Sequence, residues 1–262
     1  MIEIRDLHKS FDNKRVLDGF SLEVEDGETI SIIGSSGAGK SVTLKIISGL
    51  IQPDSGQVWV DGHHVHGLSA DALCQLRRKI GYVFQFAALF DSMTVAENVA
   101  MGLRRIRAMT ESQIQLRVST CLGLVGLEGA EDAYPSELSG GMRKRAGLAR
   151  AIVTQPKYLL YDEPTSGLDP VTTSAINGLI NRMSDEFKVT AIVVTHDMRS
   201  AYRISDRIAM LHEGSIRMVG TPDAIRAAED PIVQGFVAGA PQPDPAGASE
   251  KGAGRPRLET LR

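Results

Sequence analysis

The chain has 262 residues, 42% of them apolar, and a formal net charge of -3 at pH 7. Acidic and basic residues nearly cancel, so no large basic surface is indicated and nucleic acid is not expected as a partner. No apolar run reaches the roughly 18–20 residues that span a bilayer, so we expect any membrane role to depend on other chains.

Short β-branched runs alternate with amphipathic helical patterns, which predicts an α/β fold with a largely parallel sheet. Four strands are expected near the N-terminus, at residues 2–7, 20–24, 29–33 and 57–60. Turn residues rather than long helices separate these strands. We therefore expect this opening part of the chain to be antiparallel.

The stretch from about residue 87 to 155 has a mostly helical pattern, and we expect a helical subdomain inserted between two strands. The sheet resumes at residues 158–161 and 191–194, where polar residues follow each strand. Ligands of open α/β sheets bind at such carboxyl ends. Residues 238–262 are rich in Pro, Gly, Ala and charge, which predicts a flexible or partner-ordered tail.

A glycine-rich motif follows the strand at residues 29–33 and opens a helix. It consists of Gly34, Ser35, Ser36, Gly37, Ala38, Gly39, Lys40 and Ser41, with Val42 next in the chain. Its backbone N–H groups and the helix N-terminus suit a phosphate, which predicts a P-loop for ATP. Lys40 is expected to reach the β- and γ-phosphates, and the Ser41 hydroxyl to bind Mg²⁺. A chance glycine-rich turn is the alternative.

Two carboxylates, Asp162 and Glu163, follow the apolar strand at residues 158–161. A P-loop needs a second acidic site, because the metal is held from the other side and the attacking water is polarised. We expect Asp162 to hold Mg²⁺ and Glu163 to activate the water. Alternatively, the pair only caps the next helix.

A second anion cradle lies between these two motifs, at a helix start. It is formed by Ser139, Gly140 and Gly141, between Leu138 and Met142. One nucleotide cannot easily use two cradles of the same chain. The second cradle is therefore expected to bind the nucleotide of a partner copy.

On these residues the sequence resembles the ATP-binding cassette (ABC) ATPase family, over nearly the whole chain. The resemblance implies a P-loop, RecA-like core over residues 1–237, with an N-terminal antiparallel β subdomain and an inserted helical subdomain. It also implies roles for four further positions. Phe11 stacks on adenine, Gln85 links Mg²⁺ to the transport subunits, residues 166–169 form the D-loop, and His196 is the switch histidine. By the same resemblance, the expected catalytic residues are Lys40, Gln85, Glu163 and His196.

Three segments resemble the cassettes of Mla/Mce-type lipid transporters: residues 85–91, the Leu138–Met142 signature, in which Met142 replaces the usual glutamine, and residues 230–236. That resemblance implies a homodimeric motor at the cytoplasmic face of the inner membrane, bound to integral permease subunits. It further implies an Mce-type lipid-binding protein and a small regulatory subunit as partners, and phospholipid or another hydrophobic compound as cargo.

Phe86, Leu89 and Phe90 are candidates for the contact with a permease, with ordinary core packing as the alternative. Three functional alternatives remain open on the sequence. They are the cassette of a polar-solute, amino-acid-type importer, a soluble ABC ATPase without a transport role, and a P-loop phosphotransferase, although the last would not need the second cradle.

Overall fold

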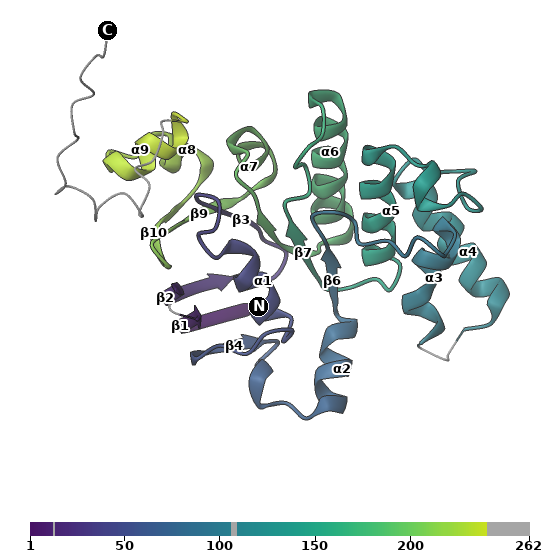
Figure 1. Ribbon diagram of the computed structural model, residues 1–262, viewed down its shortest axis with the longest axis horizontal. Coiled ribbons are helices and arrows are strands. Elements are labelled where there is room, and N and C mark those ends of the chain that lie inside the picture. The colour runs from purple at the N-terminus through teal and green to yellow at the C-terminus, as the bar shows by residue number, and fades with distance from the viewer. Residues whose placement is uncertain (13, 106–108, 240–262) are drawn as a thin grey trace, which may run out of the picture.

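The computed structural model describes residues 1–12, 14–105 and 109–239, which form two sheets with flanking helices (Figure 1). Among the described helices, none combines the length and the apolar character needed to cross a bilayer. Of the predicted tail, only residues 238–239 are described, and the rest lies outside the described residues. The predicted limits of the domain, 1–237, and of the helical subdomain, 87–155, stay predictions.

The smaller sheet has four strands and is antiparallel throughout. Its order is β2 (Lys14–Val24), β1 (Ile2–Phe11), β4 (Ser55–Val60) and β5 (His63–His64). Alternate side chains of β1, such as Ile2 and Ile4, are buried, as in a sheet with one face on the core. The antiparallel prediction is thus confirmed for residues 2–7, 20–24 and 57–60.

The larger sheet has six strands, and only its edge strand β10 runs antiparallel to its neighbour. Its order is β10 (Ser215–Gly220), β9 (Arg207–His212), β3 (Thr29–Ile33), β8 (Thr190–Val194), β7 (Tyr158–Asp162) and β6 (Ile80–Val83). The antiparallel prediction for residues 29–33 is wrong. All five residues of β3 are buried. A strand buried on both faces belongs at the centre of a parallel sheet, whereas the prediction rested on its short connection to β2.

Helices cover the larger sheet, and the helices between β6 and β7 lie beyond the edge that β6 forms (Figure 1). Outside the insertion the helices are α1 (Lys40–Ile47), α2 (Ala70–Arg78), α6 (Pro170–Phe187), α7 (Met198–Ile204), α8 (Pro222–Arg226) and α9 (Pro231–Val237), and η1 (Val65–Gly67) lies beside β4 of the smaller sheet. Between β6 and β7 the chain forms α3 (Val95–Arg104), α4 (Glu111–Leu124), η2 (Pro135–Glu137) and α5 (Gly140–Ile152).

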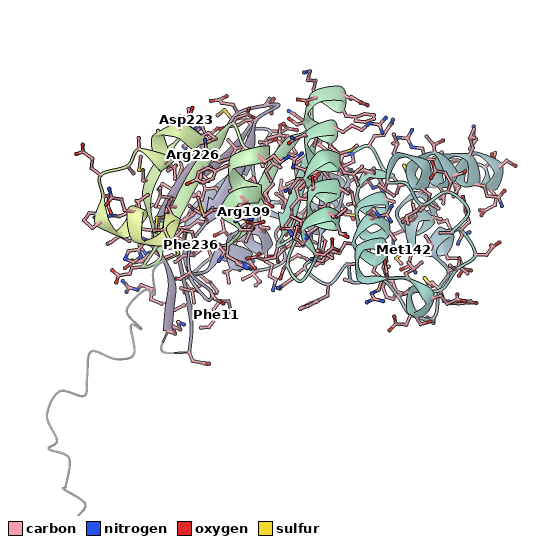
Figure 2. The ribbon with its side chains drawn as sticks, turned by 90° about the horizontal axis from the view of Figure 1, so that it is seen from above. Phe11, Met142, Arg199, Asp223, Arg226 and Phe236 are labelled. Atoms are coloured by element: carbon pink, nitrogen blue, oxygen red, sulfur yellow. The ribbon has the colours of Figure 1, made fainter. Side chains whose placement is uncertain are left out.

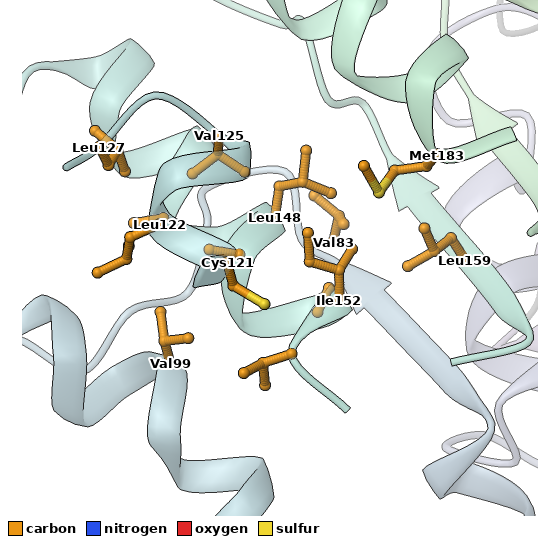
Figure 3. Close-up of a cluster of buried hydrophobic side chains, with 14 of the residues drawn as sticks. Val83, Val99, Cys121, Leu122, Val125, Leu127, Leu148, Ile152, Leu159 and Met183 are labelled. Atoms are coloured by element: carbon orange, nitrogen blue, oxygen red, sulfur yellow. The ribbon is translucent and has the colours of Figure 1, made fainter. Parts of the chain in front are cut away.

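The inserted helices share one buried cluster with the sheet (Figure 3). Leu122 of α4 and Leu148 of α5 are buried there together with Val83 of β6 and Leu159 of β7. Because interiors are close-packed, a shift of α5 is felt by the strands beside it. The insertion is therefore attached to the sheet through packed side chains as well as through its two connections.

Candidate functional site

The loop from β3 to α1 is shaped for close approach of a ligand to the backbone. Gly39, the residue before α1, has φ +104°, and a Cβ at this position would lie 2.8 Å from the carbonyl oxygen of Val16. Only glycine accepts both that dihedral angle and that neighbour. The loop therefore keeps its backbone N–H groups free of side chains at the N-terminus of α1, where negative charge is favoured.

The first residue of α1, Lys40, is buried, and its ammonium lies over the same loop. Nζ donates to the carbonyl oxygens of Gly34 at 2.8 Å and Ser35 at 2.9 Å. Burial lowers the pKa of Lys40, while the nearby carboxylates of Glu163 and Asp162 favour its charged form. A cation is thus held at the place where phosphate would meet the loop.

Asp162 ends β7 and faces α1. Ser41 Oγ donates to Asp162 Oδ1 at 2.5 Å, and the hydroxyl of Tyr82 donates to Oδ2 at 3.2 Å. Burial and the neighbouring Asp162 carboxylate raise the pKa of Tyr82 well above its usual range, so this hydroxyl stays a donor. Hydroxyl and carboxylate oxygens from three elements therefore meet beside the loop. Tyr82 was missed by sequence reasoning, because no motif marks it.

Glu163 follows Asp162 directly, and the backbone leaves strand β7 at this residue. Its φ is +49°, in the left-handed region, and its N–H donates to the carbonyl oxygen of Val194 at 2.9 Å. The Nδ1 of His196 donates to Glu163 Oε2 at 2.9 Å. The carboxylate and the imidazole come from the ends of β7 and β8, which are neighbours in the sheet. Adjacent parallel strands bring these two side chains together.

Several of these groups, among them Lys40, Ser41, Glu163 and His196, line a pocket of about 490 Å³. It is lined by Val16, Ser36, Gly37, Gly39, Lys40, Ser41, Val42, Gln85, Glu163 and His196. Five separate segments of the sequence thus meet at one place, as Gln85 follows β6 and Val16 belongs to β2. Val16 was also missed, since a single valine in a strand carries no signal for a ligand.

Phe11 and the second cradle do not line this pocket, and neither do four other predicted binding residues, Gly34, Ser35, Ala38 and Asp162. Phe11 is 42% exposed at the end of β1, with the ammonium of Lys9 5.3 Å from the centre of its ring. Ser139 and Gly140 are exposed at the start of α5, and Ser139 Oγ accepts from the N–H of Met142 at 3.2 Å. Figure 2 shows Phe11 and Met142 in separate parts of the molecule. The second cradle is therefore not part of this chain's own P-loop pocket.

The loop after Gln85 is held rigidly by two polar side chains. Ala87 and Ala88 both have left-handed φ, and Arg150 of α5 donates to their carbonyl oxygens at 2.6 Å each. Asn98 of α3 is fully buried. Its amide bonds the N–H and the carbonyl of Phe90 and the carbonyl oxygens of residues 93 and 94.

This loop directs two aromatic side chains to solvent. Phe86 is 83% exposed and Phe90 is 51% exposed, whereas Leu89 is partly buried against the core. Core packing, the alternative for all three, is therefore excluded for Phe86 and Phe90. An ordered backbone with outward-facing aromatic rings is typical of a surface that binds another protein.

The family of the chain follows from comparison with known proteins. Residues 17–166, more than half of the chain, match the family described as ABC transporter. The chain belongs to this family. The P-loop, Asp162 and Glu163 all lie within the matched part.

Relatives of known name agree with this assignment. The protein trigalactosyldiacylglycerol 3, chloroplastic, of Arabidopsis thaliana is 44% identical, over 91% of this chain and 74% of the relative. The methionine import ATP-binding protein MetN of Carboxydothermus hydrogenoformans is also 44% identical, over 90% of this chain and 71% of the relative. The chain is therefore an ATP-binding subunit of an ABC transporter.

Solved structures confirm the fold class. A dimeric ATP-binding cassette in a post-hydrolysis state, bound to ADP and Pi, superimposes with a TM-score of 0.79 at 33% identity. The match covers 85% of this chain and 99% of that chain. The chain has the α/β fold of a P-loop ABC ATPase, it binds ATP, and it is an ATPase.

Proposed function

We propose that two copies of this chain bind two ATP molecules between them and drive the membrane subunits of a transporter. The observation that carries the proposal is the separation of the P-loop pocket from the second cradle at Ser139–Gly141. A chain whose second cradle does not line its P-loop pocket suits a dimer in which each ATP contacts both copies. The similar cassette bound to ADP and Pi is itself dimeric.

Within one such site, we assign roles to the groups around the P-loop. Lys40 contacts the β- and γ-phosphates, as expected from its place over the loop. Ser139, Gly140 and Gly141 of the partner copy bind the same nucleotide from the other side. Phe11 stacks on adenine, for which its exposed ring is available. Of the remaining P-loop residues, Ser36, Gly37, Gly39 and Ser41 line the pocket together with Val42, and Gly34, Ser35 and Ala38 shape the loop behind them.

The residues beside the P-loop fit Mg²⁺. This ion prefers oxygen ligands, and the Ser41 hydroxyl lies 2.5 Å from the Asp162 carboxylate, with Gln85 lining the same pocket. Ser41, Asp162 and Gln85 are therefore the residues that would hold it. When bound, Mg²⁺ would supply positive charge that neutralises the negative charge developing on the phosphate.

Glu163 is assigned as the group that activates the attacking water. Its carboxylate lines the pocket and accepts from His196, so the imidazole fixes its orientation. His196 and Lys40 stabilise negative charge on the transferred phosphoryl group. Gln85 lines this pocket and precedes the exposed loop. It would transmit conformational changes at the nucleotide to a permease bound to that loop.

The partners proposed for the loop at residues 86–90 are integral permease subunits, which place the chain at the cytoplasmic face of the inner membrane. Phe86 and Phe90 supply apolar surface for a helix of the permease. We further propose phospholipid or another hydrophobic compound as cargo, with an Mce-type lipid-binding protein and a small regulatory subunit as additional partners. The relative named for trigalactosyldiacylglycerol, a lipid, supports this proposal.

Import of a polar solute is the second candidate. The methionine import ATP-binding protein MetN is also 44% identical to this chain. To separate the two, the chain would be purified from membranes with its permease and reconstituted in vesicles. Stimulation of ATPase activity by phospholipid but not by methionine supports the lipid proposal, and the reverse result supports the importer.

Glu163→Gln tests the site itself. Loss of the general base is expected to reduce kcat by about 10²- to 10⁴-fold while ATP still binds, so that a closed dimer accumulates. Turnover is measured by phosphate release and the dimer by analytical ultracentrifugation. Glu186→Gln, which alters an exposed carboxylate paired with Arg182, is the control. Near-normal turnover in Glu163→Gln would refute the role of Glu163.

A further inference from the structure

Lys144 is a half-buried lysine of α5 that contacts the active-site backbone of its own chain. Its Nζ donates to the carbonyl oxygen of Ser166 at 2.7 Å and to that of Glu163 at 3.2 Å. The Glu163 carbonyl also accepts from the N–H of Ser166 at 3.2 Å. One ammonium thus closes the turn that leads from Glu163 to Ser166.

This contact bears on the conformation of Glu163. Its left-handed φ is unfavourable for a residue with a side chain and persists only where the surroundings enforce it. Hydrogen bonds from a charged donor are the strong ones. Lys144 therefore helps to fix the backbone that directs the Glu163 carboxylate toward His196 and the pocket.

The same helix carries the cradle for the other nucleotide. Ser139 caps α5, and Lys144 lies within its first turns. Near that start, Gly141 packs so closely on Thr172 of α6 that a Cβ would lie 2.5 Å from the threonine methyl carbon. Lys144 and Gly141 thus join the first turns of α5 to the chain at residues 163–172. We therefore expect a shift of Ser139 to displace Glu163 as well, because packed elements transmit displacement.

We propose that Lys144 is a positioning residue that couples the two ATP sites. Binding of the partner's nucleotide at Ser139 shifts helix α5. Through its hydrogen bonds, Lys144 then orients the Glu163 carboxylate for hydrolysis of this chain's own nucleotide. The inference rests on the dimer of the proposed function. Lys144 touches neither nucleotide in this scheme. Its effect is on the rate and on the cooperativity of hydrolysis.

The test replaces Lys144 by Met, which keeps the aliphatic stem and removes the donors. ATPase rates are measured against ATP concentration with the full chain. We expect kcat to fall about tenfold or more, the loss of a charge-assisted hydrogen bond being worth about 1.5–3 kcal/mol. The Hill coefficient is expected to fall toward one, while ATP affinity, measured without turnover, stays within about twofold. Lys144→Arg, which keeps a charged donor, should restore much of both.

Lys79→Met is the matched control, since it removes a lysine that pairs with Asp61 on the surface. Thermal unfolding identifies a variant that does not fold, and Lys144→Gln, which keeps one donor, then supplies the measurement. A wild-type chain that hydrolyses ATP without cooperativity or concentration dependence would overturn the dimer. A cooperative wild type together with an unchanged kcat or Hill coefficient in Lys144→Met would overturn the coupling alone.

Discussion

The pocket at the strand ends and the loop at residues 85–94 are both held by buried polar contacts, yet they present opposite chemistry. The pocket is lined by an ammonium, a carboxylate and an imidazole, those of Lys40, Glu163 and His196. The loop turns Phe86 and Phe90 outward on a backbone that Asn98 and Arg150 secure. Gln85 belongs to both, because it lines the pocket and begins the loop.

The difference lies in what fixes each region. In the pocket, the neighbouring strands β7 and β8 bring Glu163 and His196 together, so sheet register decides the geometry. In the loop, two side chains from helices α3 and α5 decide it. The pocket should therefore depend on backbone conformation, and the loop on individual side-chain hydrogen bonds.

The largest effect is expected from Gly39→Ala. A left-handed φ and a Cβ placed 2.8 Å from Val16 O each cost about 1–3 kcal/mol, and both act on the phosphate loop. We expect ATP affinity, measured by calorimetry, to fall by about 100-fold or more. Gly27→Ala has a similar φ of +82° with open space around it and is the control. Equal affinities in the two variants would contradict a pocket set by its backbone.

An intermediate effect is expected from Asn98→Leu, which conserves volume but removes four hydrogen bonds. Leaving buried backbone groups without partners should lower the free energy of unfolding by about 2–4 kcal/mol, measured by urea denaturation. Asn181→Leu, which removes a single bond of 3.3 Å to the Arg203 carbonyl, should cost much less. A comparable loss in both would show that the loop is secured in another way.

The smallest effect on stability is expected from Phe86→Asp. Since the ring is 83% exposed, the free energy of unfolding should change by less than about 0.5 kcal/mol. Leu122→Ala, at a fully buried position of the helical cluster, should cost about 2–5 kcal/mol in the same assay. Retention of the permease by Phe86→Asp during purification from membranes would argue against the proposed docking loop.

Much of the fold and the site could be predicted because local patterns encode them. The glycines of the P-loop, the acidic pair after an apolar strand and the helix start at Ser139 each need only a few neighbouring residues to be seen. The same reasoning misplaced β3, because strand length and a short connection do not say which sheet a strand joins. Tyr82, Val16 and Lys144 were not found, since each acts through a neighbour that is distant in sequence.

By itself, the sequence determined the kinds of groups this chain possesses and the order in which they occur: a phosphate loop, two carboxylates, a histidine and a second anion cradle. Only the tertiary structure decided which of them meet. Parallel strands placed residues more than a hundred positions apart within hydrogen-bonding distance, as for Ser41 and Asp162, and left Ser139 away from them. Contacts of this kind depend on packing between elements, and no local pattern of residues encodes that packing.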